Sequence, residues 1–158
     1  MLTERYESFK ALAEQKSIRL TLQLPEKPVI AHVDPDSLHK ILNNLFYNAL
    51  NYGKTTVNVK MSMPGHKQDY FQIEFSNDGD LVPPAMREKI FEPFYRLQET
   101  INRPGTGIGL TLSRSHVTLH KGELYLQDRI DETNTFIVSM PIHQHLTTGE
   151  TAKPGAGL

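Results

Sequence analysis

The chain has 158 residues, 38% of them hydrophobic and 22% charged, which is ordinary for one globular domain with a substantial core. Its 17 basic and 18 acidic residues nearly balance and form no basic stripe, which argues against nucleic-acid binding. No apolar run approaches the roughly 20 residues of a membrane-spanning helix. The absence of cysteine excludes disulfides, thiolate metal sites and cysteine nucleophiles, and is compatible with a cytoplasmic location.

The first third of the chain predicts one helix, two strands and the start of a longer helix. Apolar spacing favours a short helix over 6–16, and alternation over 18–24 indicates a strand. A second short strand is expected at 29–33. Asp34 and Pro35 then provide an N-cap and a first helical position.

The helix that follows has the strongest pattern in the sequence. Apolar residues recur every three or four positions, which predicts one buried face, and Gly53 is expected to end the helix. These apolar residues are Leu38, Ile41, Leu42, Leu45, Phe46, Ala49 and Leu50.

The next segments predict paired strands and a short helix. β-rich runs over 55–63 and 70–75, separated by residues 64–67, are expected to pair. Residues 77–79 form an Asn-Asp-Gly turn signal, and 83–94 is expected to hold a short helix.

The last third predicts a mobile segment, a helix and a terminal hairpin. Residues 97–106 are polar and contain proline and glycine, which is typical of a mobile loop. A helix is expected over 107–120, with Ile108, Leu112, Ser115 and Leu119 on one stripe. Strands are expected at 123–127 and 135–140, before a polar tail.

These elements together predict an α/β (α+β) two-layer sandwich. We expect a mixed, mostly antiparallel sheet of about five strands, covered on one face by about three helices. Seven histidines are scattered along the chain, and only His116 and His120 share a helical spacing. With no third ligand beside them, a solvated helix face is favoured over a metal site.

Three asparagines on the best helix form the first chemical signal. Asn44, Asn48 and Asn51 fall on one narrow stripe beside the apolar face. Each costs about 0.5 kcal/mol of helix stability relative to alanine. Amide oxygens are good neutral ligands for a hard cation such as Mg²⁺, so we favour a functional stripe over a plain solvent-facing edge.

A glycine-rich segment before the last helix forms the second signal. Residues 105–110 read Gly-Thr-Gly-Ile-Gly-Leu and lead directly into the helix. Glycines permit close approach of a ligand to the backbone, and a helix N-terminus favours phosphate. The spacing matches neither a dinucleotide fingerprint nor a Walker A loop, and taken alone the segment is equally a flexible hinge.

The order of four segments resembles the ATP-binding catalytic domain of bacterial sensor histidine kinases, in the GHKL superfamily. The resemblance runs from about Thr21 to Ile142, and the closing strand 135–141 also fits it. The four segments are Asn44 to Ala49, which resembles the N box, Asn77 to Pro83 (G1 box), Phe91 to Arg96 (F box) and Gly105 to Leu110 (G2 box).

The resemblance implies that ATP and Mg²⁺ bind between the N-box helix and an ATP lid at 97–106. Asn48 is expected to hold Mg²⁺ with help from Asn44, and Arg96 to stabilise charge on the transferring phosphoryl group. Asn48 and Arg96 are therefore the expected catalytic residues. The expected nucleotide-binding residues are Asn44, Asn48, Asn51, Tyr52, Asn77, Gly79, Val82, Phe94, Arg96, Gly105, Thr106, Gly107, Gly109, Leu110 and Thr135.

Three positions depart from the family pattern. Asn77 stands where an aspartate usually accepts from the adenine amino group, Leu81 replaces a glycine, and Asn51 replaces a frequent lysine. A neutral acceptor at Asn77 is expected to weaken ATP binding by about 1 kcal/mol. The alternative to a kinase is a degenerate nucleotide-binding or interaction module of the same fold.

The resemblance also implies a reaction type. Gyrase-like ATPases carry a water-activating glutamate where this chain has Asn44, so phosphoryl transfer is favoured over hydrolysis.

Partners and domain boundaries follow from the same resemblance. No histidine here stands in a phosphoacceptor motif, so the acceptor is expected on a dimerisation domain, with a response regulator receiver acting indirectly. Residues 1–17 are expected to be a remnant of that domain, 18–145 the catalytic domain and 146–158 a flexible tail. The fragment is expected to be monomeric and unable to autophosphorylate alone, and the full-length protein is expected to be a homodimer. The expected location is cytoplasmic, as the cytoplasmic part of a membrane-bound sensor, without direct membrane contact of this domain. A sigma-factor serine kinase shares the fold, but the Phe91–Arg96 cluster disfavours it.

Overall fold

A computed structural model describes residues 1–63, 69–96, 105–128 and 131–143. The elements in chain order are α1 (Leu2–Gln15), β1 (Arg19–Gln23), α2 (Pro35–Tyr52), β2 (Thr56–Ser62), β3 (Tyr70–Asn77), two 3-10 turns (Pro84–Met86 and Lys89–Phe91), α3 (Gly109–Leu119), β4 (Glu123–Leu126) and β5 (Asn134–Pro141). The lid predicted at 97–106 falls largely outside the described residues, as does the tail.

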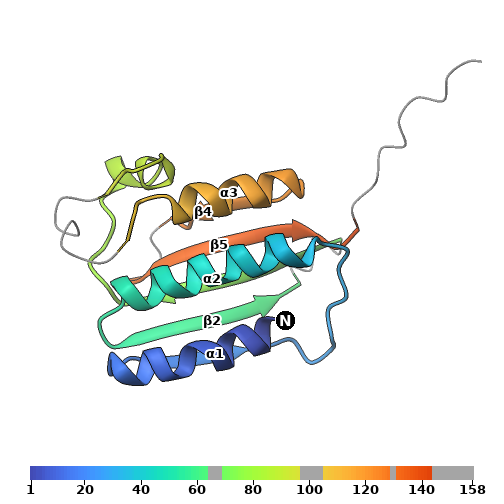
Figure 1. Cartoon of the computed structure of the whole chain (residues 1–158), viewed down its shortest axis with the longest axis horizontal. Helices are drawn as coiled ribbons and strands as arrows, with labels where there is room; N and C mark the ends of the chain where they lie inside the picture. The colour runs from blue at the N-terminus through green and yellow to red at the C-terminus, as the bar shows by residue number, and fades with distance from the viewer. Residues whose placement is uncertain (64–68, 97–104, 129–130, 144–158) are drawn as a thin grey trace, which may run out of the picture.

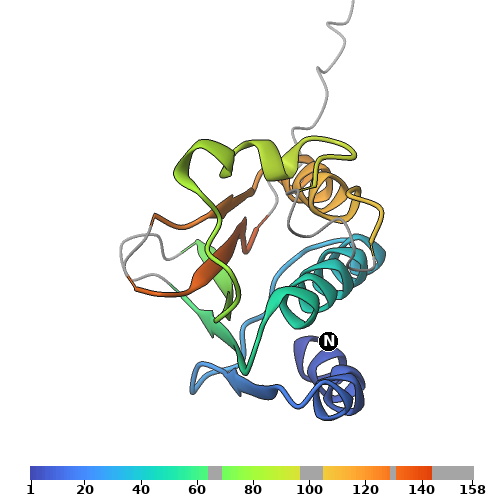
Figure 2. The same cartoon turned by 90° about the vertical axis from the view of Figure 1, so that its left-hand side faces the viewer.

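The strands form one mixed sheet in the order β1-β2-β3-β5-β4. β1 runs parallel to β2, and the other three pairings are antiparallel. The three α-helices lie on one face of this sheet, with α2 between α1 and α3 (Figures 1 and 2). The predicted two-layer α/β fold is confirmed.

Helix α2 is the centre of the core. Its apolar face is almost completely buried, as the periodicity predicts. Phe46 stacks on Phe9 of α1 with ring centroids 5.0 Å apart, and meets Phe75 of β3 edge-on at 5.1 Å. The Phe46 side chain therefore packs α2 against both α1 and β3.

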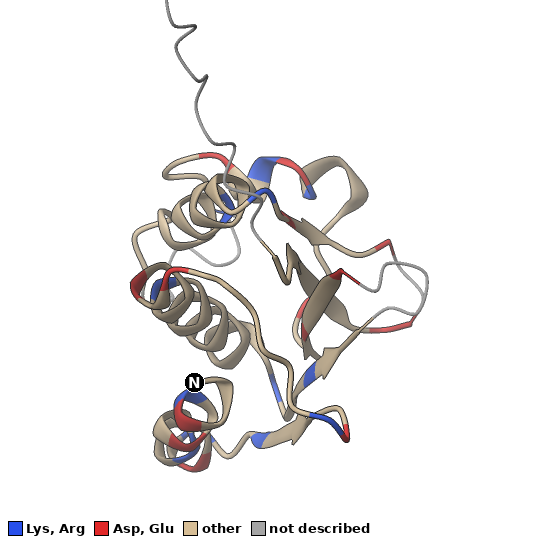
Figure 3. Ribbon diagram, turned by 90° about the vertical axis from the view of Figure 1, so that its right-hand side faces the viewer, with Lys and Arg blue, Asp and Glu red and all other residues tan. Residues whose placement is uncertain are grey.

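Helix α1 packs against α2 as part of this core. Ala13 is buried, and Leu2, Tyr6 and Leu12 pack against the core from the same helix. Figure 3 shows α1 with many charged residues, and its outer surface carries the Lys10–Glu7 ion pair. The domain boundary expected after residue 17 stays a prediction.

The strand predicted at 29–33 does not form. The segment has no regular structure, although His32 donates its backbone N–H to the Ile142 carbonyl at 2.9 Å. Val29, Ala31 and Val33 still pack against the core as partly buried residues. Alternating burial therefore arises here without strand pairing, which is why the periodicity was misleading.

Helix α3 buries a different face from the predicted stripe. Ser113 and Val117 are completely buried, whereas Leu112 and Leu119 are exposed. Since Ser113 receives a hydrogen bond from Asn44 of α2, a polar residue occupies the interface that the sequence pattern assigned to apolar ones.

The N-terminus of α2 is capped from two directions. The Asp34 side chain accepts from the Ser37 N–H at 2.8 Å, which confirms the predicted N-cap. The Asp34 backbone N–H also donates to Nε2 of His120 at 3.2 Å. His120 is buried between α3 and α2, so the solvated histidine face expected from the sequence is wrong for this residue.

Within the described residues, none of the helices has the length and apolar character needed to cross a membrane.

Candidate nucleotide site

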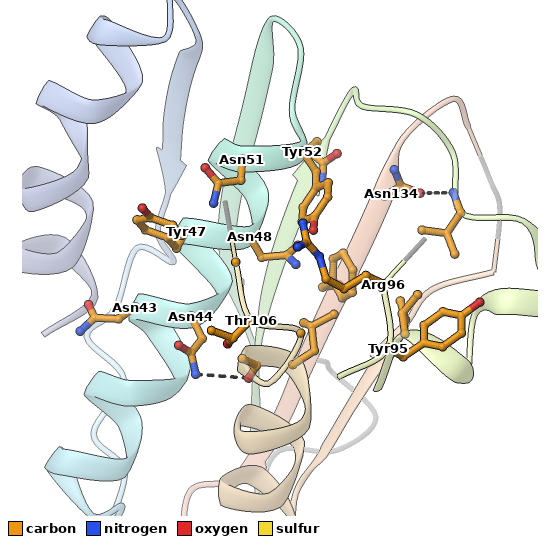
Figure 4. Close-up of a pocket in the computed structure, with 18 of the residues that line it drawn as sticks. Asn43, Asn44, Tyr47, Asn48, Asn51, Tyr52, Tyr95, Arg96, Thr106 and Asn134 are labelled. Carbon is orange, nitrogen blue, oxygen red and sulfur yellow. Dashed lines mark hydrogen bonds between the residues drawn. The ribbon is translucent and has the colours of Figure 1, made fainter. Parts of the chain in front are cut away.

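A cavity of about 680 Å³ opens between α2, the start of α3 and the segment that follows β3. This volume lies within the range of small-molecule sites. Figure 4 shows polar side chains of α2 on one side and Tyr95 and Arg96 on the other. The residues predicted from sequence that line it are Asn44, Asn48, Asn51, Tyr52, Asn77, Val82, Arg96, Gly105, Thr106, Gly107, Gly109 and Leu110.

The asparagine stripe of α2 forms one wall. Nδ2 of Asn44 donates to the Gly109 carbonyl and to the Ser113 hydroxyl, both at 3.2 Å, and so ties α2 to the first turn of α3. The Asn48 side chain makes no hydrogen bond within the described parts of the chain, and it extends toward Arg96 across the cavity (Figure 4). Asn48 is therefore available to a ligand, whereas the amide nitrogen of Asn44 is already engaged.

The opposite wall is held by backbone contacts around Gly107. The Phe94 N–H donates to the Gly107 carbonyl at 2.9 Å, which joins the end of the Phe91–Arg96 segment to the glycine-rich turn. Gly107 has a φ of 74°, and a Cβ there would lie 3.0 Å from the Phe94 backbone. Only glycine satisfies both this conformation and this close approach.

The floor of the cavity lies where β3 meets the end of α2. A Cβ on Gly79 would lie 2.0 Å from the Tyr52 carbonyl oxygen, so the turn requires glycine at this position. The Asp78 carboxylate accepts the backbone N–H groups of residues 54–56 at 2.9 to 3.1 Å, and also the Thr55 hydroxyl. Burial raises the pKa of Asp78, but these hydrogen bonds outweigh it and hold the pKa well below the usual range.

Three of the predicted nucleotide-binding residues do not line this cavity. Gly79 packs beneath it against Tyr52. Phe94 is 73% exposed and is not among the lining residues. Thr135 hydrogen-bonds to Ser76 and lines a separate depression. Because side chains alternate along a strand, its neighbours Asn134 and Phe136 face the cavity instead.

Sequence reasoning missed Asn134. Its Nδ2 donates to the Asp80 carbonyl at 2.9 Å and its Oδ1 accepts from the Val82 N–H at 3.0 Å, so it holds the loop after β3 against β5. Strict alternation from the buried Phe136 would have identified it.

Helix α1 also contributes lining residues that were not predicted. Arg5, Ser8 and Phe9 reach the cavity, next to Asn43 and Tyr47 of α2. The helical spacing of the three α1 residues was the available signal.

A family model described as histidine kinase-, DNA gyrase B- and HSP90-like ATPase matches residues 33–144, well over half of the chain. The chain belongs to this ATPase family. The resemblance to the catalytic domains of sensor histidine kinases is thereby confirmed.

Curated relatives of this ATPase domain are sensor kinases. The sensor histidine kinase CpxA of Escherichia coli K12 is 31% identical over 134 residues, covering 84% of this chain and 29% of CpxA. The sensor protein VanSC of Enterococcus gallinarum is 30% identical over 143 residues, covering 89% of this chain and 38% of VanSC. The chain spans about a third of the length of the first curated relatives it matches.

Solved structures share the fold. The catalytic domain of histidine kinase ThkA superposes with a TM-score of 0.76 at 22% identity, covering 89% of this chain and 91% of ThkA. Full-length ShkA in complex with AMPPNP gives a TM-score of 0.76 at 21% identity, covering 89% of this chain and 29% of ShkA.

The cavity of this ATPase domain fits a nucleotide. Apolar side chains from Val82, Ile90 and Phe136 line one part, and amides, Arg96 and the α3 N-terminus line another. No group of three or more His, Cys, Asp or Glu able to hold a metal occurs in the described ranges. A metal here would therefore rely on amide oxygens such as that of Asn48 together with phosphate oxygens.

Proposed function

We propose that this chain binds Mg-ATP and transfers the γ-phosphoryl group to a histidine on the dimerisation domain of a sensor histidine kinase. One observation carries the proposal: the Asn48 amide makes no hydrogen bond with any described residue and faces Arg96 across a nucleotide-sized cavity. Catalysis of phosphoryl transfer depends mainly on positioning and charge neutralisation, and these two side chains supply both.

In this proposal, the position of each residue in the cavity determines its role. Asn48 holds Mg²⁺, with the Asn44 oxygen as a second ligand, while the Asn44 nitrogen keeps α3 in place. The first turn of α3 presents backbone N–H groups to the phosphates. Arg96 neutralises charge on the transferring group, and Tyr52 and Val82 contact the base.

Transfer to an external histidine is favoured over hydrolysis. Asp80 is the one carboxylate among the described lining residues, and it pairs with Lys54. Asn44 supplies an amide where hydrolysis would need a carboxylate to activate water. We further propose a cytoplasmic location, where ATP is available, and indirect action on a response regulator receiver domain.

Titration with a non-hydrolysable ATP analogue, with and without Mg²⁺, tests the site. We expect binding to require Mg²⁺ and to weaken at least tenfold in Asn48→Ala. Lys40→Ala, at an exposed position of the same helix outside the cavity lining, is the control. Magnesium-independent binding, or equal affinity in both variants, would refute the assigned role of Asn48.

A second experiment separates the kinase from a degenerate binding module. A phosphoacceptor domain from a related sensor kinase is mixed with this chain and labelled ATP. Phosphohistidine that depends on Arg96 supports the kinase. Nucleotide binding without any label on several acceptor domains supports the binding module.

A further inference from the structure

The buried amide of Asn77 is the least satisfied polar group on the cavity floor. Asn77 ends β3, is 2% exposed and is among the lining residues. Its Oδ1 accepts the Gly79 backbone N–H at 3.1 Å. Its Nδ2 has no hydrogen-bond partner in the described structure. Buried amide groups are nearly always paired, so this donor calls for an acceptor.

The orientation of this amide is fixed by its neighbour. Rotating the amide by half a turn would place its NH₂ group against the Gly79 N–H, and two donors would then face each other. The oxygen therefore stays on Gly79, and the remaining position of the side chain is a donor.

The other polar side chains of the floor are engaged. Asn134 uses its nitrogen on Asp80 and its oxygen on Val82. Asp78 directs its carboxylate to the backbone of residues 54–56. Among these three floor side chains, only Asn77 keeps an uncommitted group for a ligand.

A donor at this position discriminates between purine bases. Adenine presents an amino donor at carbon 6 and an acceptor at N1. A 6-oxopurine such as hypoxanthine or guanine presents a carbonyl acceptor at carbon 6. The Asn77 nitrogen pairs directly with that carbonyl, whereas an adenine amino group would oppose it and the base must shift to offer N1.

We infer that Asn77 makes this cavity accept 6-oxopurine nucleotides at least as well as adenine nucleotides. The inference rests on the proposed nucleotide site and concerns its base selectivity. Asp at this position would reverse the preference, because its second oxygen can only accept and would pair with the adenine amino group.

Calorimetric titration with Mg-ADP and Mg-IDP tests the inference, because the two bases differ only at carbon 6 and the N1 proton. For the wild type we expect an IDP affinity equal to or above that of ADP. For Asn77→Asp we expect the IDP-to-ADP affinity ratio to fall at least tenfold. Asn43→Asp adds the same charge away from the floor and is expected to lower both affinities without changing the ratio.

The outcomes separate this inference from the proposed function. If neither nucleotide binds the folded wild type, the nucleotide site itself is refuted. If ADP binds more than tenfold tighter than IDP in the wild type, or Asn77→Asp folds and leaves the ratio unchanged, the inference on Asn77 is overturned while the site stands. The wild-type ratio decides the matter even if the Asn77 variant does not fold.

Discussion

The two walls of the cavity are fixed by different forces. The α2 wall is backed by a row of fully buried apolar side chains that pack on α1 and the sheet. The facing segment holds two 3-10 turns and is joined to the glycine-rich turn by the Phe94–Gly107 hydrogen bond. Packing thus positions the amides rigidly, while backbone contacts position the arginine-bearing side. Changes on the α2 side should cost stability, and changes on the other side should cost much less.

Two phenylalanines give the largest expected contrast. Phe46→Ala should lower the free energy of unfolding by about 4 kcal/mol, because it leaves a cavity between Phe9 and Phe75. Phe94→Ala, in the segment that faces α2 but outside the cavity lining, removes an exposed ring and should change the free energy of unfolding by less than about 0.5 kcal/mol. Urea unfolding followed by circular dichroism measures both. Similar losses in the two variants would remove the distinction between the walls.

Two glycines repeat the contrast at the level of the backbone. Gly79→Ala forces its Cβ against the Tyr52 carbonyl, so we expect a loss of about 3 kcal/mol. In Gly109→Ala the nearest atom, Cγ of Asn44, lies at 3.6 Å, so the methyl group fits. Alanine also favours the helix there, and we expect no loss. Thermal unfolding of both variants tests this, and an unaffected Gly79 variant would contradict the floor geometry.

Asp78 predicts a pH dependence on the α2 side. Asp78→Asn should lower the free energy of unfolding at pH 7 by about 1.5 kcal/mol through weakened hydrogen bonds to residues 54–56. The folded pKa lies below the unfolded value of about 3.9, so the contribution is present above that pH. It is lost as the pH falls from about 4 toward the folded pKa. The gap between wild type and variant should therefore narrow in that range.

Asp131 provides the control for this pH dependence. The hydrogen bonds from Thr133 lower its pKa as well, but they span only two residues in an exposed turn. Asp131→Asn is expected to change stability less than Asp78→Asn at pH 7. A larger loss of stability in Asp131→Asn than in Asp78→Asn would contradict the dominant role given to the Asp78 hydrogen bonds.

Asn44 and its neighbour Asn43 give the smallest expected contrast, and Asn44 joins the two sides. Asn44→Ala removes the hydrogen bonds to Gly109 and Ser113 and should cost about 1 kcal/mol. Asn43→Ala, one residue earlier on the same helix, should cost less than about 0.5 kcal/mol. Equal values by chemical denaturation would show that Asn44 does not couple α2 to α3.

Most of the fold could be predicted because α2 and the paired strands carry strong local periodicity. The segment 29–33 could not, since alternating burial looks the same whether or not a strand partner exists. The buried face of α3 was also missed, because Ser113 is polar and its burial depends on Asn44, which is 69 residues away.

The asparagine stripe and the glycine-rich turn were predictable because each breaks a local preference. The family motif identifies the last strand but not which of its side chains face the cavity, so it predicts Thr135 instead of Asn134. The Asn77 nitrogen has no partner among the described residues, and this could not be foreseen, because it depends on the Gly79 N–H donating to the oxygen of the same amide. Such pairings depend on three-dimensional geometry rather than on residue type.

The hydrogen bond between Phe94 and Gly107 has a consequence for how the chain tolerates changes in length. This bond joins residue 94 directly to residue 107, so the two ends of the intervening segment are held together by backbone contact. Doubling the number of residues in such a loop costs only about 0.6 kcal/mol of closure entropy. Insertions between these two residues are therefore expected to leave the register of the sheet and helices unchanged, because the two ends of the segment remain joined.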